Sequence, residues 1–257
     1  MGAKNLTCVL LCVSIPQAFC LAEKRGSAGL PSLVSLSSST RDLEAKERLL
    51  SAITTKFPDS GPALLQLAET TSDADTRWMA IRGVGMLKSR RATPFLVRSL
   101  LSEHHYVRAN AARALGEIRA ATAGRALIDL LMREQDGGVI EQASLALSMI
   151  GAREAVPVLK SKATHPSVQT RTWIFQAIGK LGSKDDVPFL AVHLYNENSS
   201  ASMAAAKAME RMVGIDFGFP KREGPSSPEE SLRNARLWWE AHKATWGKTP
   251  ERESPER

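Results

Sequence analysis

A repeat of about 31 residues constrains the fold of this chain more than any other feature of its sequence. A triplet of small or apolar residues returns along the chain, and its third members lie 31, 32, 31 and 31 residues apart. The copies are Gly83-Val84-Gly85, Ala114-Leu115-Gly116, Ala146-Leu147-Ser148, Ala177-Ile178-Gly179 and Ala208-Met209-Glu210. A period of this length is typical of proteins in which small supersecondary units stack on one another.

A second marker keeps the same phase. Nine residues after the third members of the first four triplets stand Pro94, Arg125, Pro157 and Pro188, and a leucine follows each of them two residues later. Proline is favoured in the first turn of a helix, because its missing N–H would have no partner there. The first helix of each unit is therefore expected to begin near this marker.

The triplet itself lies in a predicted second helix. Around Gly116, spacing at 100° per residue predicts one inward face, made of Arg108, Ala111, Ala112, Leu115 and Ile118. Glycine inside a helix costs about 1 kcal/mol relative to alanine. A glycine that recurs at this place predicts that a neighbouring helix approaches the backbone closely. Such helix pairs cannot bury their apolar faces alone, so they must stack.

These patterns predict an all-α fold, a right-handed α-α superhelix (solenoid) of about five helix pairs. Aromatic residues make up 5% of the chain, which favours closely packed helices over sheets. Second helices are expected near 42–56, 73–88, 105–118, 137–150, 166–181 and 199–213. First helices are expected near 62–71, 92–103, 122–134, 153–164 and 185–195.

The N-terminus has the layout of a secretory signal peptide. Lys4 is followed by an uncharged stretch from Leu6 to Leu21, and Cys20 and Ala22 fit a small-x-small cleavage site. We predict a signal peptide over 1–22, a flexible lead-in over 23–40, the solenoid over 41–213, a turn and capping helix over 214–246 and a disordered tail over 247–257. The signal predicts export, to the periplasm or cell envelope of a bacterium or as a secreted protein.

Removal of the signal has two chemical consequences. All three cysteines, Cys8, Cys12 and Cys20, lie inside it, so the mature chain would lack a disulfide and a thiolate nucleophile. The long apolar stretch is removed with it, so no transmembrane span is expected in the mature chain. The whole chain has a net charge of +7, which becomes +6 without Lys4. That charge suits anionic envelope polymers or lipid surfaces, whereas export argues against nucleic acid.

Parts of the chain resemble a known family. Val107-Arg108 followed by Ala111-Ala112-Arg113-Ala114-Leu115-Gly116 is similar to the HEAT-repeat consensus, in the short form shared with phycobilisome-lyase-like repeats. The resemblance implies that an arginine early in the second helix supports the turn between helices. Arg77, Arg108 and Arg171 occupy that place, whereas Ile140 and Ser202 depart from it.

The C-terminal part carries a second resemblance. Gly214-Ile215-Asp216-Phe217-Gly218 and the later Leu237-Trp238-Trp239-Glu240 resemble the end of many exported bacterial HEAT-repeat proteins. This resemblance implies a turn that leads into a tryptophan-bearing helix that caps the array. HEAT repeats serve many uses, so the family alone assigns no activity.

The sequence shows no recognisable catalytic or metal-ligand pattern. The histidines are scattered, and no Gly-rich phosphate loop or Gly-x-Ser-x-Gly elbow occurs. We therefore predict no cofactor, no metal and no enzymatic activity. Aspartates such as Asp73 and Asp136 stand at helix starts, where capping is the expected role.

A surface remains as the candidate site. In the second helices, positions three before and one after the end of the triplet should lie opposite the inward face, where a basic groove could bind a partner. The candidate partner-binding residues are Arg82, Arg113, Trp173, Gln176, Lys180, Lys207 and Arg211. The alternative is an ordinary solvated helix face with scattered charge.

Three functions are compatible with these features of the sequence. The first is a non-enzymatic scaffold that binds a protein or peptide on the concave face of the solenoid. The second, from the family resemblance, is a bilin-lyase-like enzyme that holds a tetrapyrrole. The third is a polyanion-binding module at the cell envelope. We expect the scaffold, because no acid–base pair is evident and export separates the chain from bilin chemistry.

Overall fold

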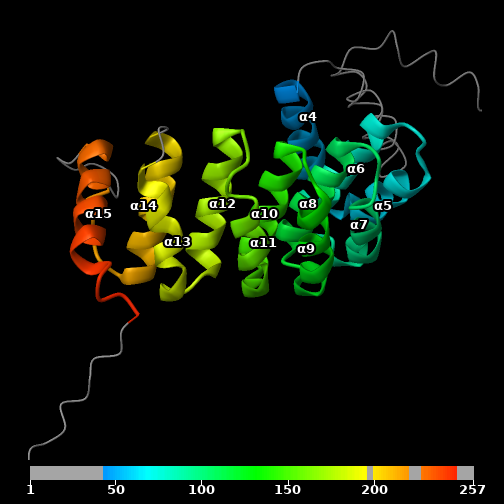
Figure 1. Ribbon diagram of the computed structural model, residues 1–257. Helices are drawn as coiled ribbons and strands as arrows, with labels where there is room; N and C mark the ends of the chain where they lie inside the picture. The colour runs from blue at the N-terminus through cyan, green and yellow to red at the C-terminus, as the bar shows by residue number, and fades with distance from the viewer. Residues whose placement is uncertain (1–42, 196–198, 220–226, 248–257) are drawn as a thin grey trace, which may run out of the picture. The chain divides into compact units, whose positions relative to one another are not determined.

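The computed structural model describes residues 43–195, 199–219 and 227–247 (Figure 1). The predicted signal peptide and lead-in, and the tail from residue 248 on, lie outside the described residues. Every regular element in the described part is helical. The chain divides into two compact units, one up to Ala152 and the other from Arg153. No helix among the described residues is long and apolar enough to cross a membrane.

The first unit is a stack of helix pairs. A single helix, α4 (Leu43–Lys56), precedes three pairs, in each of which the first helix packs on the second. The pairs are α5 (Gly61–Thr70) with α6 (Ala74–Met86), α7 (Thr93–Ser99) with α8 (His105–Ile118), and α9 (Gly124–Arg133) with α10 (Gly137–Ile150). The second helices pack directly on one another, α6 on α8 and α8 on α10.

Small residues set the spacing between these second helices. A Cβ placed on Gly85 would lie 2.9 Å from Ala114 Cα, and one on Gly116 would lie 2.8 Å from Ala146 Cα. Real Cβ atoms are essentially never found this close to a backbone atom. The repeated triplet therefore marks the line along which one second helix touches the next, as the sequence predicted.

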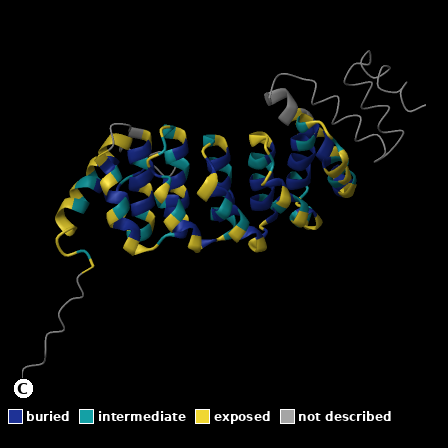
Figure 2. Ribbon diagram, turned by 45° about the vertical axis from the view of Figure 1, so that its right-hand side comes forward, coloured by how far each residue is buried: buried dark blue, intermediate teal, exposed yellow. Residues whose placement is uncertain are grey.

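The core of the first unit is built from aliphatic side chains and alanine. On α8, the buried apolar residues are Val107, Ala111, Ala112, Ala114, Leu115 and Ile118. Figure 2 shows buried residues along the sides of the helices that face their neighbours. Burial of apolar surface of this kind stabilises a fold by roughly 25 cal/mol per Å².

Arginines early in the second helices hold the inter-helix turns. Arg108 donates from Nη1 to the carbonyl oxygens of Ser102 and Glu103, at 2.9 and 2.8 Å. It also forms a two-pronged ion pair with Glu134, from Nε at 2.7 Å and Nη2 at 3.0 Å. Arg77 bonds the carbonyl of Thr71 in the same way.

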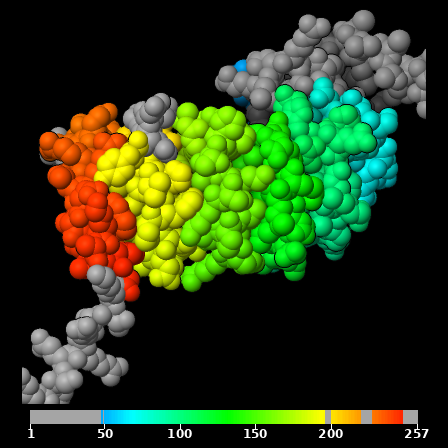
Figure 3. All heavy atoms as spheres, in the orientation of Figure 1, coloured from blue at the N-terminus to red at the C-terminus, as the bar shows by residue number. Residues whose placement is uncertain are grey.

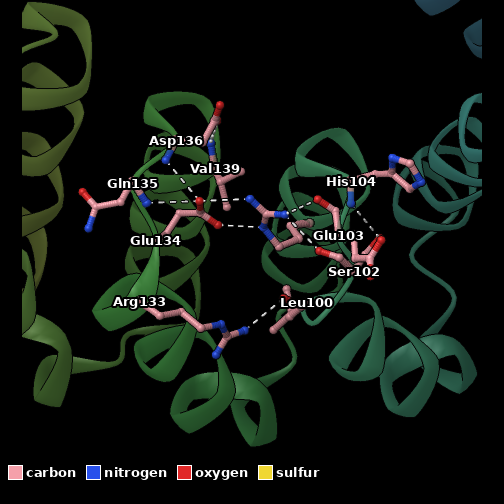
Figure 4. A network of polar contacts seen from close by, with 10 residues as sticks. Leu100, Ser102, Glu103, His104, Arg133, Glu134, Gln135, Asp136 and Val139 are labelled. Atoms are coloured by element: carbon pink, nitrogen blue, oxygen red, sulfur yellow. Dashed lines mark hydrogen bonds and ion pairs between the residues drawn. The ribbon is translucent and has the colours of Figure 1, made fainter.

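The repeat that has Ile140 in the arginine position holds its turn with a carboxylate. Glu134 Oε1 accepts the backbone N–H groups of Gln135 and Asp136, both at 3.1 Å (Figure 4). Asp136 then caps α10 by accepting the N–H of Val139 at 3.0 Å. Glu134 thus joins two consecutive repeats through Arg108.

The second unit also contains helix pairs, and a final helix packs against the last of them. Its helices are α11 (Val156–Ser161), α12 (Val168–Leu181), α13 (Val187–Val192), α14 (Ser199–Val213) and α15 (Pro228–His242). Helix α12 packs on α14, and a Cβ on Gly179 would lie 2.8 Å from Ala208 Cα. Arg171 on α12 bonds the carbonyls of His165 and Pro166, at 2.7 and 2.9 Å.

Helix α15 lies beside α14, as Figures 1 and 3 show. Arg236 donates twice to the carbonyl oxygen of Leu194, and Asn234 donates to that of Phe217 at 3.1 Å. The ring of Phe217 packs 5.7 Å from that of Trp238. These contacts make α15 the tryptophan-bearing capping helix that the sequence predicted.

The fold class is confirmed as an all-α HEAT-type solenoid with a C-terminal capping helix. The second helices have the predicted bounds to within about two residues, the usual uncertainty of helix ends. The first helices α7, α9, α11 and α13 are shorter than expected at both ends, and a 3₁₀ turn precedes each of them, such as Arg90–Ala92 before α7. Proline stands in the first turn of α5, α7, α11 and α13.

Candidate functional site

In the first unit, the predicted basic residues Arg82 and Arg113 are both engaged in ion pairs within the fold. Arg82 on α6 is only 6% exposed. Its Nη1 donates to both carboxylate oxygens of Glu117 on α8, at 3.0 and 2.9 Å. Arg113 bonds the same carboxylate from Nε at 3.2 Å. Arg82 is therefore buried, which corrects its predicted place on an open basic face, whereas Arg113 is partly exposed and bonds the same carboxylate.

The cause of this burial is the close approach of the second helices. The position one residue after the triplet folds back over the glycine of the preceding repeat. Glu117 Oε2 lies 2.8 Å from where a Cβ on Gly85 would stand, and Met149 Sδ lies 3.3 Å from the corresponding point on Gly116. Arg82, one turn before Gly85 on the same helix, is thereby within reach of Glu117.

In the second unit, the predicted row is open to solvent. Gln176 and Lys180 on α12 are exposed, as are Lys207 and Arg211 on α14, and Trp173 is partly exposed. Arg211 Nη1 lies 3.5 Å from where a Cβ on Gly179 would stand, so its guanidinium reaches over α12. Within the described residues, Lys180, Lys207 and Arg211 have no carboxylate within ion-pairing distance.

A cavity of about 470 Å³ lies at the end of this row. Its lining combines two cations, two carboxylates and two apolar side chains: Lys207, Glu210, Arg211, Gly214, Ile215, Asp216 and Phe219. The ammonium of Lys207 lies 5.2 Å from the centre of the Phe219 ring, a cation–π distance. Ile215 and Phe219 were not among the site residues predicted from the sequence, although the Gly-Ile-Asp-Phe-Gly turn follows the row directly.

The two carboxylates of the cavity hold the turn that forms its far wall. Glu210 Oε2 accepts the N–H of Phe217 at 2.8 Å, and Asp216 Oδ1 accepts the N–H of Gly218 at 2.8 Å. Gly214, with φ of 75°, ends α14 in the left-handed region that favours glycine. The row and the turn therefore converge on one place in the second unit.

Titratable groups elsewhere in the second unit have structural surroundings. His193 lies between the rings of Phe175 and Phe189, at 4.7 and 4.9 Å. Its burial, and secondarily the charge of Arg171, lower the pKa of the imidazole from its ordinary value of 6.5. Among the described residues, no cluster of three or more His, Cys, Asp or Glu side chains could hold a metal ion.

Comparison with known proteins assigns the family. The family described as HEAT repeats matches residues 61–148 and 124–210. These matches span more than half of the chain. The chain belongs to the HEAT-repeat family. The solved complex of CpcE and CpcF of phycocyanin lyase from Nostoc sp. PCC 7120 has a similar fold, with a TM-score of 0.50 and 20% identity over 81% of this chain and 94% of that chain.

Two curated proteins share sequence with this HEAT-repeat chain. Phycocyanobilin lyase subunit alpha of Nostoc sp. PCC 7120 is 31% identical over 134 residues, which are 52% of this chain and 41% of that protein. Bilin biosynthesis protein PecE of Mastigocladus laminosus is 28% identical over 157 residues, 58% of each chain. The chain thus spans about half the length of the curated relatives it matches.

These relatives correct two predictions. The prediction of no enzymatic role is contradicted, because the matched proteins are named as a lyase subunit and a bilin biosynthesis protein. A solenoid can form a site from surface positions of several repeats, so the lack of a local catalytic motif did not justify that prediction. The predicted export is contradicted by the same relatives, neither of which is named as an exported protein. An apolar stretch behind a single lysine was too weak a signal to assign the location.

Proposed function

We propose that this chain acts as a subunit of a bilin-lyase-type enzyme and holds a linear tetrapyrrole on the second helices of its second unit. The observation that carries the proposal is the 31% identity with phycocyanobilin lyase subunit alpha over about half of the chain. The chain belongs to the HEAT-repeat family, and its fold is similar to that of the solved CpcE–CpcF complex of phycocyanin lyase. The open row on α12 and α14 supplies the surface.

The chemistry of that row suits the ligand. A bilin combines conjugated pyrrole rings with propionate carboxylates, so it needs both a flat apolar contact and cations. Trp173 offers an aromatic face, and aromatic side chains favour stacked or tilted ring contacts. Lys180 and Arg211 offer charge-assisted hydrogen bonds, for which guanidinium geometry matches a carboxylate well. These cations are exposed and form no ion pair within the described residues, whereas Arg82 and Arg113 both bond Glu117.

The contribution of this chain to catalysis would be to hold and orient the pigment. The row supplies cations, an amide and an indole rather than an acid–base pair. Fixing a reactant against its acceptor can by itself lower a barrier by several kcal/mol, because the entropy of bringing the two together is lost on binding. We therefore assign binding and orientation to the row and no covalent step to its side chains.

A second protein is part of the proposal. The relative from Nostoc is named as a subunit, and this chain spans 41% of it. HEAT solenoids expose extended surfaces that serve protein binding. We infer that the chain works with a protein partner, which retains the core of the scaffold prediction within an enzymatic role.

Absorbance of the pigment tests the proposal. The purified full-length chain would be titrated with phycocyanobilin in the dark, with bovine serum albumin as a non-specific control. Immobilising the pigment on the chain predicts a saturable, red-shifted and sharpened visible band. A spectrum that matches the albumin control at every protein concentration would remove the proposed function.

A second arm addresses the acceptor. The loaded chain would be mixed with apo-phycocyanin, and pigment that remains with the acceptor after denaturing electrophoresis would be measured with and without candidate second subunits. We expect transfer to depend on a second subunit. Transfer by this chain alone, at the same rate, would contradict the inferred partner while leaving pigment binding intact.

A further inference from the structure

The cavity at the end of α14 is built partly from residues beyond the repeats. The HEAT match ends at residue 210, whereas the far wall of the cavity is the turn from Gly214 to Phe219. We propose that this cavity is a subsite for one carboxylate group carried on an apolar ring body. The proposal rests on the proposed function only for the identity of the natural ligand.

Two cations point to an anionic ligand. Lys207 and Arg211 stand four residues apart on α14, so they are neighbours on one helix face. Like charges at this spacing repel one another. Both residues are exposed, and within the described part of the chain neither forms an ion pair. An incoming anion would relieve this repulsion.

The neighbouring carboxylates do not perform that task. Glu210 Oε2 and Asp216 Oδ1 accept the backbone N–H groups of Phe217 and Gly218, each at 2.8 Å. These hydrogen bonds hold the turn in place. The charged groups of Lys207 and Arg211 line the cavity without forming an ion pair to either carboxylate. The same two negative charges make the cavity a poor place for a doubly charged phosphate or a long polyanion. A single carboxylate therefore fits better than either.

Size and apolar surface define the rest of the ligand. A volume of about 470 Å³ exceeds the need of an inorganic ion and falls within the range of small-molecule pockets, about 300–1,000 Å³. Ile215 is 40% exposed and provides an apolar wall. The ring of Phe219 is nearly buried beneath Lys207 and positions its ammonium. A ring-bearing carboxylate would contact the wall with its ring and the cations with its oxygens.

The position of Arg211 connects this subsite to the rest of the row. Its guanidinium reaches over Gly179 on α12, next to the exposed Lys180. A ligand longer than one ring could therefore extend from the cavity along α12. This geometry fixes the orientation of a bound ligand. One carboxylate would lie at the C-terminal end of α14, and the remaining rings would extend toward Gln176 and Trp173.

A simple probe tests the subsite without a bilin. Calorimetric titration of the full-length chain with naphthylpropionate would be compared with its primary amide and with naphthyl phosphate. The acid should bind about tenfold more tightly than the amide, as expected for one charge-assisted hydrogen bond. It should also bind more tightly than the phosphate. Equal binding of acid and amide, or preference for the phosphate, would overturn the proposal.

Variants locate the preference. The Lys207→Gln/Arg211→Gln double variant should bind acid and amide equally, whereas Lys184→Gln, an exposed lysine of a 3₁₀ turn, should keep the tenfold difference. Circular dichroism would show that both are folded. A preference for the acid that persists in the double variant would contradict the assigned residues.

Phycocyanobilin and its dimethyl ester separate this proposal from the proposed function. If phycocyanobilin binds more tightly than its dimethyl ester, and the double variant loses this difference, both the subsite and the proposed function are supported. Equal binding of acid and ester overturns the subsite but leaves pigment binding. Binding of naphthylpropionate without binding of phycocyanobilin overturns the proposed function but leaves the subsite.

Discussion

At the scale of single residues, glycine in the second helices lowers helix propensity but allows the next second helix to pack closely against the backbone. Gly85, Gly116 and Gly179 each bring the next second helix to a distance at which a Cβ would meet an alanine backbone. The position after the triplet in the next repeat then lies over that glycine, as Glu117 and Arg211 do. The same residue type thus fixes both the packing and the placement of surface charge.

The substitution Gly116→Ala tests this contact. Alanine gains about 1 kcal/mol of helix propensity, but its Cβ would stand 2.8 Å from Ala146 Cα, and overpacking costs about 1–3 kcal/mol. We expect a net loss of roughly 1 kcal/mol in the free energy of unfolding, measured in urea. Gly138→Ala, whose Cβ would approach only the side chain of Asp136, is the matched control. Equal effects of both variants would remove the packing argument.

The Arg108–Glu134 pair gives a pH prediction. Burial opposes ionisation of Glu134, but hydrogen bonds from Arg108 and from the N–H groups of Asp136 and Gln135 outweigh it and lower the pKa of Glu134 below its ordinary value of 4.5. A depressed carboxylate pKa contributes stability above the unfolded value, and this contribution is lost as pH falls through the folded pKa.

The variant Glu134→Gln isolates this contribution. It should lower the free energy of unfolding at pH 7 by roughly 3 kcal/mol, because Arg108 would be left without its charge partner. Below pH 4.5 the difference from the unmodified chain should shrink. Thermal unfolding between pH 7 and pH 3 would show this as converging melting curves. A difference that stays constant over that range would contradict the assigned pKa direction.

The sequence and its family resemblance predicted some of these contacts and missed others. The family resemblance implied that Arg77, Arg108 and Arg171 hold turns, and each of them bonds a carbonyl oxygen of the turn just before its own helix. The burial of Arg82 was missed because its partner, Glu117, lies 35 residues away on the next second helix. Only the close approach at Gly85 brings the two together, and a helical face drawn for one helix cannot show it.

At the scale of elements, second helices were more predictable than first helices. The second helices carry both the glycine contact line and a regular inward face, and α8 and α10 have the expected bounds. The first helices were expected to be longer, since a 3₁₀ turn such as Ala121–Ala123 continues the helical pattern of the sequence without being α-helical. Hydrophobic spacing does not separate these two helix types.

The capping helix depends on one aromatic contact. Phe217 is 3% exposed and packs on Trp238, while its carbonyl accepts from Asn234. Phe217→Ala should reduce the free energy of unfolding of the second unit by about 3–5 kcal/mol. Ile215→Ala, at an exposed neighbouring position, should change it by less than about 0.5 kcal/mol. Tryptophan fluorescence in guanidinium would report both, and similar midpoints would contradict the cap.

At the scale of the whole molecule, the repeat family was accessible from sequence and the function was not. A solenoid distributes its site over several repeats, so no local motif marks an activity. The open row of the second unit was predicted as a basic surface, and its proposed ligand came from relatives rather than from the pattern. In the first unit, Arg82 and Arg113 are paired within the fold, which is a structural role.

Whether the open row on α12 and α14 holds the pigment is tested most directly by the dissociation constant of phycocyanobilin. We would compare the unmodified chain with Lys180→Glu/Arg211→Glu and with the matched control Lys184→Glu, using the absorbance change on binding. Losing two charge-assisted contacts predicts binding weaker by about tenfold or more in the double variant, with the control unchanged. Equal dissociation constants for all three proteins would contradict the claim.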